Sequence, residues 1–185
     1  MRKAADRSSG GPGRRLRPLG PQVVRIDAPR DLVFAQIAVP YRAVNPPREL
    51  RAKIEVLERG AETVIAAHRT RVGCLTVVTV ESVTFSPPDE IRFRLLRGPV
   101  PFVSERFFLR ETADGVTELE YTGELGTNLW AAGEAWGSLV ARHWERTVAI
   151  ALRTLKASAE TMAARAAARR LGSARSDRGE RVSER

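Results

Sequence analysis

The chain has 185 residues, of which 43% are hydrophobic and 29% charged, enough for one globular domain with its own core. No apolar run reaches the ~18 residues of a membrane-spanning helix, and the first residues lack the apolar segment of a signal peptide, so we expect a cytoplasmic protein. One cysteine, Cys74, and two histidines, His68 and His143, exclude an internal disulfide and a Cys/His metal cluster. We therefore expect no metal and no other cofactor.

The formal charge of +9 is concentrated at the two ends of the sequence. Residues 1–21 carry +5, residues 165–185 carry +4, and the residues between them are balanced. Both ends are poor in large apolar side chains, so we expect a disordered basic tail at residues 1–21 and a helix extension followed by a second such tail at residues 161–185. These tails are either solvated sequence without function or a weak contact for an anionic membrane or RNA. The neutral centre predicts no specific DNA binding.

Hydrophobic periodicity predicts the elements of the central region. A short strand at residues 22–27 precedes a helix that begins at Ala28-Pro29 and ends before Pro40. The prolines of residues 40–47 predict a turn or a second short helix. Six further strands are predicted at residues 54–57, 63–70, 74–85, 91–96, 102–109 and 117–125.

A long final helix is predicted from Leu129 to residue 170 or 171, because Gly172 suits the position after a helix end. At ~1.5 Å per residue this helix is longer than the domain, so the part after about Thr161 should project into solvent. Before that point, apolar residues recur every three or four positions and form the only large helical face that can cover a sheet. The order of elements predicts an α+β protein whose curved antiparallel sheet packs on this helix.

Three segments of this sequence, in their order and spacing, resemble one known superfamily. They are Val24-Arg25-Ile26-Asp27-Ala28-Pro29, Leu96-Arg97-Gly98-Pro99 and Leu152-Arg153-Thr154-Leu155-Lys156. Residues 22–160 are similar to the START/Bet v 1-like superfamily, also called SRPBCC, which includes polyketide cyclase/dehydrase-like and lipid-transport proteins. The resemblance implies a helix-grip ligand-binding domain: a seven-stranded antiparallel curved sheet wrapped around a long C-terminal helix, one or two small helices after the first strand, and an apolar cavity between sheet and helix. Residues 40–47 depart from the family because they lack the tryptophan often found after the first helix.

The turn between the last two strands decides which side chains face the interior. A three-residue loop at residues 113–115 separates apolar from polar positions better than a two-residue Asp-Gly loop. The resulting pairs are Leu119 with Leu109, Tyr121 with Phe107, Gly123 with Glu105, Leu125 with Val103 and, on the outer face, Arg110 with Glu118. Glu105 is therefore predicted to point inward.

Glu105 is the leading candidate for ligand contact, because a carboxylate among apolar side chains must be paired, hydrated or kept neutral. It either orients a polar group of a ligand, acts as a general base, or lies near the cavity mouth, where it is solvated or paired with an arginine. The candidate ligand-binding residues are Glu105, Phe107, Tyr121, Trp136, Val140, His143, Trp144 and Thr147. The aromatic members and His143 can equally belong to the core or its rim. His68, beside Arg69 and Arg71, is interpreted as facing outward or lying at a sheet edge.

Three function classes remain open at this point. The favoured one is a non-catalytic binder or carrier of a small hydrophobic molecule such as a lipid, a polyketide or an isoprenoid, because no catalytic motif accompanies the expected pocket. The alternative is an enzyme of the polyketide cyclase/dehydrase type that uses the same polar groups for acid/base work. The third is an interaction module whose basic tails contact RNA, the ribosome or a membrane. No catalytic residue is assigned.

Overall fold

The computed structural model describes residues 15–127 and 131–183 of the chain. The elements in chain order are β1 (Arg15–Ile26), α1 (Arg30–Arg42), α2 (Arg48–Arg51), β2 (Ile54–Arg59), β3 (Thr63–Val72), β4 (Leu75–Ser86), β5 (Glu90–Arg97), β6 (Phe102–Glu111), β7 (Thr117–Thr127) and α3 (Ala131–Ser183). The strands form a seven-stranded antiparallel sheet in the order β1-β7-β6-β5-β4-β3-β2. The predicted helix-grip architecture, with two short helices after the first strand, is confirmed.

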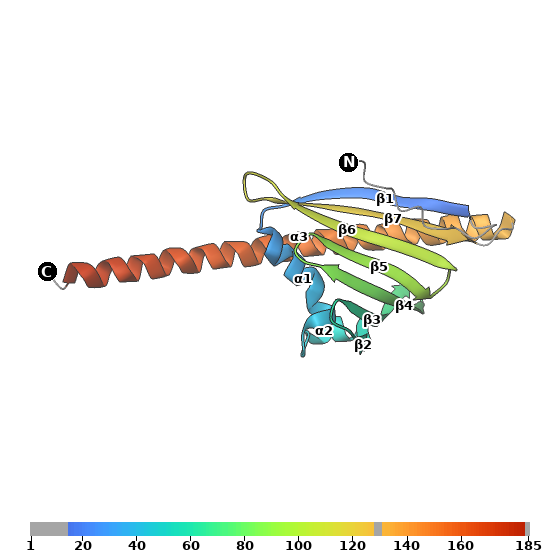
Figure 1. Ribbon diagram of the computed structural model, residues 1–185, viewed down its shortest axis with the longest axis horizontal. Helices are drawn as coiled ribbons and strands as arrows, with labels where there is room; N and C mark the ends of the chain where they lie inside the picture. The colour runs from blue at the N-terminus through green and yellow to red at the C-terminus, as the bar shows by residue number, and fades with distance from the viewer. Residues whose placement is uncertain (1–14, 128–130, 184–185) are drawn as a thin grey trace.

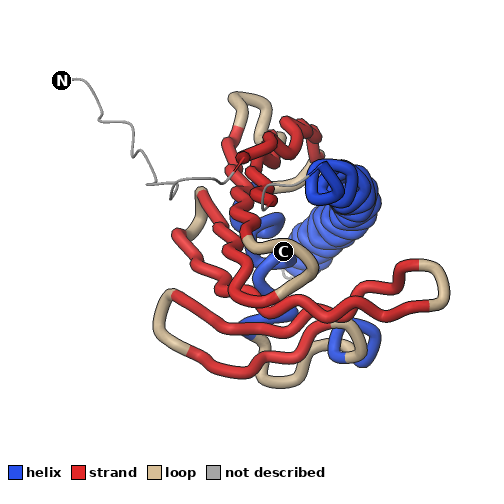
Figure 2. Tube along the Cα trace, turned by 90° about the vertical axis from the view of Figure 1, so that its right-hand side faces the viewer, coloured by secondary structure: helices blue, strands red, loops and turns tan. Residues whose placement is uncertain are grey.

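The path of the chain explains where the two short helices lie. Strands β2 to β7 are sequential neighbours, whereas β1 pairs with β7 at the opposite edge from β2. The chain must therefore cross the sheet between β1 and β2, and α1 and α2 make this crossing (Figure 1). Viewed along α3, the strands curl around that helix (Figure 2).

The core lies between the inner face of the sheet and the helices. Helix α3 packs on β1, β7 and α1. Its buried side chains recur at helical spacing and are Ala141, Val148, Leu152 and Ala159. On the sheet, alternate residues of each strand point inward, as expected for a sheet that buries one face. Aromatic rings cross this face from strand to strand: Phe93 lies 5.4 Å from Phe107, and Phe107 lies 5.2 Å from Tyr121, between ring centroids.

Polar contacts fix α3 to the junction between β1 and α1. Lys156 Nζ donates to the backbone oxygen of Arg25 and to Glu160 Oε1, both at 2.6 Å, and the Asp27 backbone N–H donates to the same Glu160 oxygen at 3.0 Å. Beyond this anchor, residues 164–170 are all exposed. The prediction that the helix projects past the domain is confirmed (Figure 1).

The helix does not end at residue 170 or 171, as predicted, but continues through Gly172 to Ser183. A glycine inside a helix costs only about 1 kcal/mol relative to alanine, and no proline follows to force an end. The 53 residues of α3 span about 80 Å. The predicted helix start at Leu129 lies outside the described residues.

The first strand begins earlier than predicted, at Arg15 instead of residue 22. Leu19, assigned to a disordered tail, is 1% exposed and belongs to the core. The period-two pattern was hidden because the register of β1 on β7 shifts between Leu19 and Gln22. Gly20 lies at this irregularity with φ +79°, and a Cβ there would lie 2.9 Å from the Tyr121 backbone oxygen. The tail predicted for residues 1–14 lies outside the described residues.

Helix α1 also passes the residue at which it was predicted to end. It contains Pro40 and closes after Arg42, where the Ala43 backbone N–H donates to the Val39 oxygen. Tyr41 is buried in this last turn, with its ring 5.9 Å from both the Phe85 and Phe93 rings. This packing holds the turn in place although Pro40 supplies no backbone donor.

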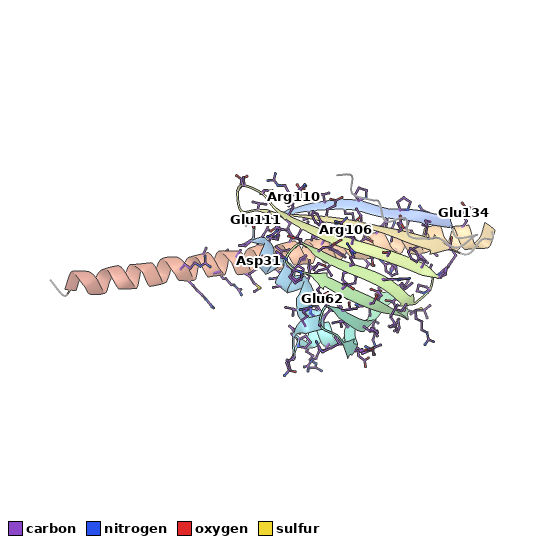
Figure 3. The ribbon with its side chains drawn as sticks, in the orientation of Figure 1. Asp31, Glu62, Arg106, Arg110, Glu111 and Glu134 are labelled. Atoms are coloured by element: carbon purple, nitrogen blue, oxygen red, sulfur yellow. The ribbon has the colours of Figure 1, made fainter. Side chains whose placement is uncertain are left out.

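The predicted register of β6 and β7 is confirmed at each of its five pairs, from Val103 with Leu125 to Arg110 with Glu118. Gly115 has φ +73°, and its N–H donates to the Thr112 oxygen at 3.0 Å, as the three-residue loop requires. Arg106 and Arg110 of β6 are exposed (Figure 3). Glu105, between outward neighbours, faces the interior.

The N-terminal half of β1 should be needed for stability, and a matched pair of leucines tests this. Leu19→Ala removes a fully buried side chain and should lower the free energy of unfolding by about 2 to 4 kcal/mol. Leu16→Ala, at a position 43% exposed in the same strand, should change it by less than about 0.5 kcal/mol. Urea denaturation followed by circular dichroism measures both. Equal, small effects would show that β1 contributes nothing before Gln22.

Candidate functional site

Glu105 lies at the boundary between the sheet and α3, where three elements meet. Its side chain is 6% exposed. Carboxylate oxygen Oε1 accepts hydrogen bonds from the Tyr121 hydroxyl of β7 and from the Trp144 indole N–H of α3, both at 2.7 Å. The buried carboxylate is therefore stabilised by two neutral hydrogen-bond donors and not by an arginine. The sequence-based alternative of a solvated carboxylate beside an arginine is wrong.

The position opposite Glu105 must be a glycine for the carboxylate to fit. Gly123 pairs with Glu105 across β6 and β7. A Cβ at Gly123 would lie 2.8 Å from the Ser104 backbone oxygen and 3.3 Å from Glu105 Cγ. Any side chain there would displace the stem of Glu105.

Burial raises the pKa of Glu105 from 4.5 to about 7, and the neighbouring Glu81 carboxylate adds to the rise. The hydrogen bonds from Trp144 and Tyr121 and the nearby His68 oppose it. Glu105 therefore exchanges its proton near neutral pH. This is the range in which a carboxyl group serves as a general acid or base.

A second polar group lies on the same inner face, and sequence reasoning missed it. His68 of β3 places Nδ1 3.1 Å from Glu81 Oε2 and Nε2 3.0 Å from the Tyr41 hydroxyl. The Thr79 hydroxyl donates to Glu81 Oε1 at 2.7 Å. A proton on His68 Nδ1 satisfies both of its contacts, because Nε2 then accepts from Tyr41. Burial and the Glu81 and Glu105 carboxylates raise the pKa of Tyr41 well above its usual value, so its hydroxyl keeps its proton.

The interpretation of His68 as outward or at an edge is wrong. The Gly73-Cys74 turn pairs Val72 with Leu75, which sets His68 opposite Thr79. The same register applied to the sequence would have placed His68 and Glu81 on the face of Val83 and Phe85, which are buried. The signal was present in the sequence, but the adjacent Arg69 and Arg71 obscured it.

The predicted residues of α3 occupy different surroundings. Trp144 reaches Glu105, and Val140 packs against the core. Trp136 is 49% exposed and donates its indole N–H to the Pro99 oxygen. Thr147 is exposed, and its hydroxyl donates a hydrogen bond to the His143 backbone oxygen of the same helix. His143 Nε2 is buried and has no hydrogen-bond partner among the described residues.

The structure thus brings together Glu105, Phe107, Tyr121 and Trp144 from the predicted set. Phe107 lies beside Tyr121 and packs against the core. Within residues 15–127 and 131–183, no three His, Cys, Asp or Glu side chains gather as a metal site would need. No helix in the same residues has the length and hydropathy to cross a membrane.

A pH-dependent stability measurement should detect the buried carboxyl group. The native state holds the Glu105 proton up to about pH 7, whereas the unfolded chain releases it near 4.5. The wild type therefore loses up to about 3 kcal/mol of unfolding free energy from this group between these two values. Glu105→Gln has no charge to bury and can still accept the two hydrogen bonds. The variant should gain stability relative to the wild type as pH rises from 5 to 8.

Urea denaturation at pH 5 and pH 8 measures this difference. Glu118→Gln is the control, because it removes a carboxylate from the outer face of the same strand pair, where Glu118 meets the exposed Arg110. The difference in unfolding free energy between Glu118→Gln and the wild type should change little from pH 5 to pH 8. A Glu105→Gln difference that is the same at both pH values would contradict the burial of an ionisable group.

Comparisons with known proteins bear on the fold. The sequence matches no protein-family model and no curated protein. Among solved structures, the Zhui aromatase/cyclase from Streptomyces sp. R1128 superposes with a TM-score of 0.64 at 21% identity, over 80% of this chain and 94% of that chain. A START superfamily protein from Mycobacterium smegmatis gives 0.56 at 14%, over 80% and 98%. Ara h 8.0201 gives 0.52 at 12%, over 82% and 98%. These likenesses show that the chain has the helix-grip fold, as the sequence resemblance implied.

Proposed function

We propose that this protein binds or carries a small hydrophobic molecule, such as a lipid, a polyketide or an isoprenoid, between the inner face of its sheet and α3. The apolar body of the ligand lies against the aromatic rings of β5 to β7, and the polar groups around Glu105 orient it. Burial of apolar surface supplies the affinity, at roughly 25 cal/mol per Å² of surface removed from water.

The observation that carries this proposal is the position of Glu105. A buried carboxyl group costs folding free energy, and an apolar residue there would pack without that cost. Glu105 instead lies among Phe93, Phe107 and Tyr121, and its bonds link the sheet to α3. A polar group that weakens the core is expected where a ligand needs it.

Two solved structures of this fold are an aromatase/cyclase and a START superfamily protein, so the fold is compatible with the ligand binder and with the catalytic alternative below. Val140, His143, Thr147 and Trp136 of α3 complete the proposed contact set. The buried Nε2 of His143 has no partner among the described residues and would gain one from a ligand.

A catalytic alternative, an enzyme of the polyketide cyclase/dehydrase type, is favoured by one observation. The pKa of Glu105 near 7 suits a group that takes and returns protons at neutral pH. In this alternative Glu105 moves protons on a poly-β-ketone, and Tyr121 and Trp144 are positioning residues. A weak contact of the basic ends with an anionic membrane or RNA stays a separate prediction.

Binding of an uncharged fluorescent probe, N-phenyl-1-naphthylamine, tests the proposal. The wild type should bind it with a Kd below about 10 μM. Val140→Trp introduces a large ring at a helix position that packs against the core and should weaken binding at least about tenfold, because it occupies the ligand's volume. Native mass spectrometry of the purified protein should also find a co-purified small molecule.

Leu139→Trp is the matched control, since Leu139 is the neighbouring residue of α3 and is 55% exposed. It should leave both probe affinity and melting temperature unchanged. Failure of the wild type to bind the probe, together with the absence of any co-purified molecule, would overturn the proposed function.

A further inference from the structure

The polar groups of the inner face have already committed their hydrogen-bond donors to one another. Tyr121 and Trp144 both donate to Glu105. Thr79 donates to Glu81. With its proton on Nδ1, His68 also donates to Glu81, and Tyr41 donates to His68. A ligand that needs donors would therefore have to break one of these bonds or rely on His143 Nε2, which has no partner among the described residues.

One acceptor in this network is left over. Both bonds to Glu105 end on Oε1, and Oε2 takes part in no hydrogen bond found within the described residues. A carboxylate has about four lone-pair sites and accepts only. Oε2 therefore has acceptor capacity that no hydrogen bond among the described residues uses, and a ligand donor can take it.

Most of the charges around this oxygen are negative. The buried charged side chains of the described residues are all carboxylates: Glu81, Glu90 and Glu105. Glu90 is neutralised at the outer face by Arg92 and Arg106, whereas no arginine or lysine contacts Glu81 or Glu105 in the part of the chain described. Glu145 of α3 adds a third negative group near the site, because it contributes with Glu105 and Glu81 to the raised pKa of Tyr121.

The basic groups close to the network offset these carboxylates only in part, since His68 lowers the pKa of Glu105 against the larger effects of burial and Glu81. Arg59 of β2 donates to the backbone oxygens of Tyr41 and Ala43, so its charge is directed to the chain after α1. His68 uses both ring nitrogens within the network. His143 Nε2 of α3 makes no hydrogen bond to Glu105, Glu81 or Glu145 among the described residues.

We propose that the site selects ligands whose polar end donates hydrogen bonds and carries no negative charge, such as an alcohol, a phenol or an amine, and rejects carboxylates. This rests on the proposed function, because it assigns the polarity of the ligand that the same site binds. A hydroxyl or ammonium group donates to Glu105 Oε2 without disturbing any existing bond. A carboxylate is repelled by Glu105, Glu81 and Glu145.

Three probes that share one apolar body measure this selectivity: 2-naphthalenemethanol, 2-naphthylmethylamine and 2-naphthoate. Isothermal titration at pH 8, where Glu105 is mostly ionised and the amine is protonated, should give a Kd for the amine equal to or lower than that of the alcohol. The Kd of the naphthoate should be at least about 30-fold higher. At pH 5.5 the naphthoate is still ionised but Glu105 is protonated, so the ratio should fall to within about fivefold.

Two variants locate the cause of the selectivity. Glu105→Gln removes the charge and adds an amide donor. The ratio of the naphthoate Kd to the alcohol Kd at pH 8 should therefore fall to within about fivefold, as for the wild type at pH 5.5. Glu118→Gln, on the outer face, should keep the wild-type ratio. The wild-type pH series needs no substitution and decides the question even where a variant folds poorly.

The outcomes separate the two claims. Binding of N-phenyl-1-naphthylamine together with equally tight binding of naphthoate and alcohol at pH 8 would overturn the selectivity and leave the proposed function standing. Absence of binding for all four probes would overturn the proposed function itself. A naphthoate ratio that does not change with pH would show that Glu105 does not cause the rejection.

Discussion

The inner face of the sheet is wider than the helix that covers it. Seven strands at about 4.8 Å spacing make a surface roughly 29 Å across, whereas a helix with its side chains is about 10 Å wide. Helix α3 packs on β1 and β7, and α1 fills part of the remainder. The inner faces of β3 to β6 must be covered in another way. Part of this surface is covered because the sheet curls on itself. Other parts are covered by the ring of Tyr41 and by the aromatic rings of β5 and β6.

The buried polar groups lie in that part of the molecule. Glu81 lies on β4, His68 on β3 and Glu105 on β6, whereas α3 packs mainly on β1 and β7. Their hydrogen bonds involve Tyr41 of α1 and Trp144 of α3, so these two helices are linked to the sheet through polar contacts. Such networks are electrostatically strong at low dielectric and costly when a member is missing. The interior therefore combines an apolar floor with polar groups whose positions are fixed from several elements.

Much of the site followed from the sequence where a turn fixed the register. The Ala113–Gly115 loop determined that Glu105, Phe107 and Tyr121 share one face, because a strand has a side-chain period of two and no intermediate register exists. The same reasoning, applied to the turn at Gly73-Cys74, could have placed Glu81 and His68 on the inner face. The helical face predicted for α3 put Trp144 in the same candidate set as Glu105, but their direct hydrogen bond was not predicted, since the exact rotation of α3 against the sheet depends on packing that no local pattern encodes. Leu19 was missed because the irregularity at Gly20 breaks the alternation on which a strand is recognised.

The unbroken course of α3 has a mechanical consequence. The helix is held against the domain by Lys156 and Glu160, near which its last buried residue, Ala159, also lies. About 36 Å of helix follow between Ala159 and Ser183. A rigid rod pivoting at Ala159 by about 10° would carry its far end through about 6 Å, whereas Trp144, on the other side of the pivot, would move by about 4 Å in the opposite sense. The free arm is thus longer than the arm that reaches Glu105, and it magnifies any tilt of α3 beside the site into a larger displacement outside the domain.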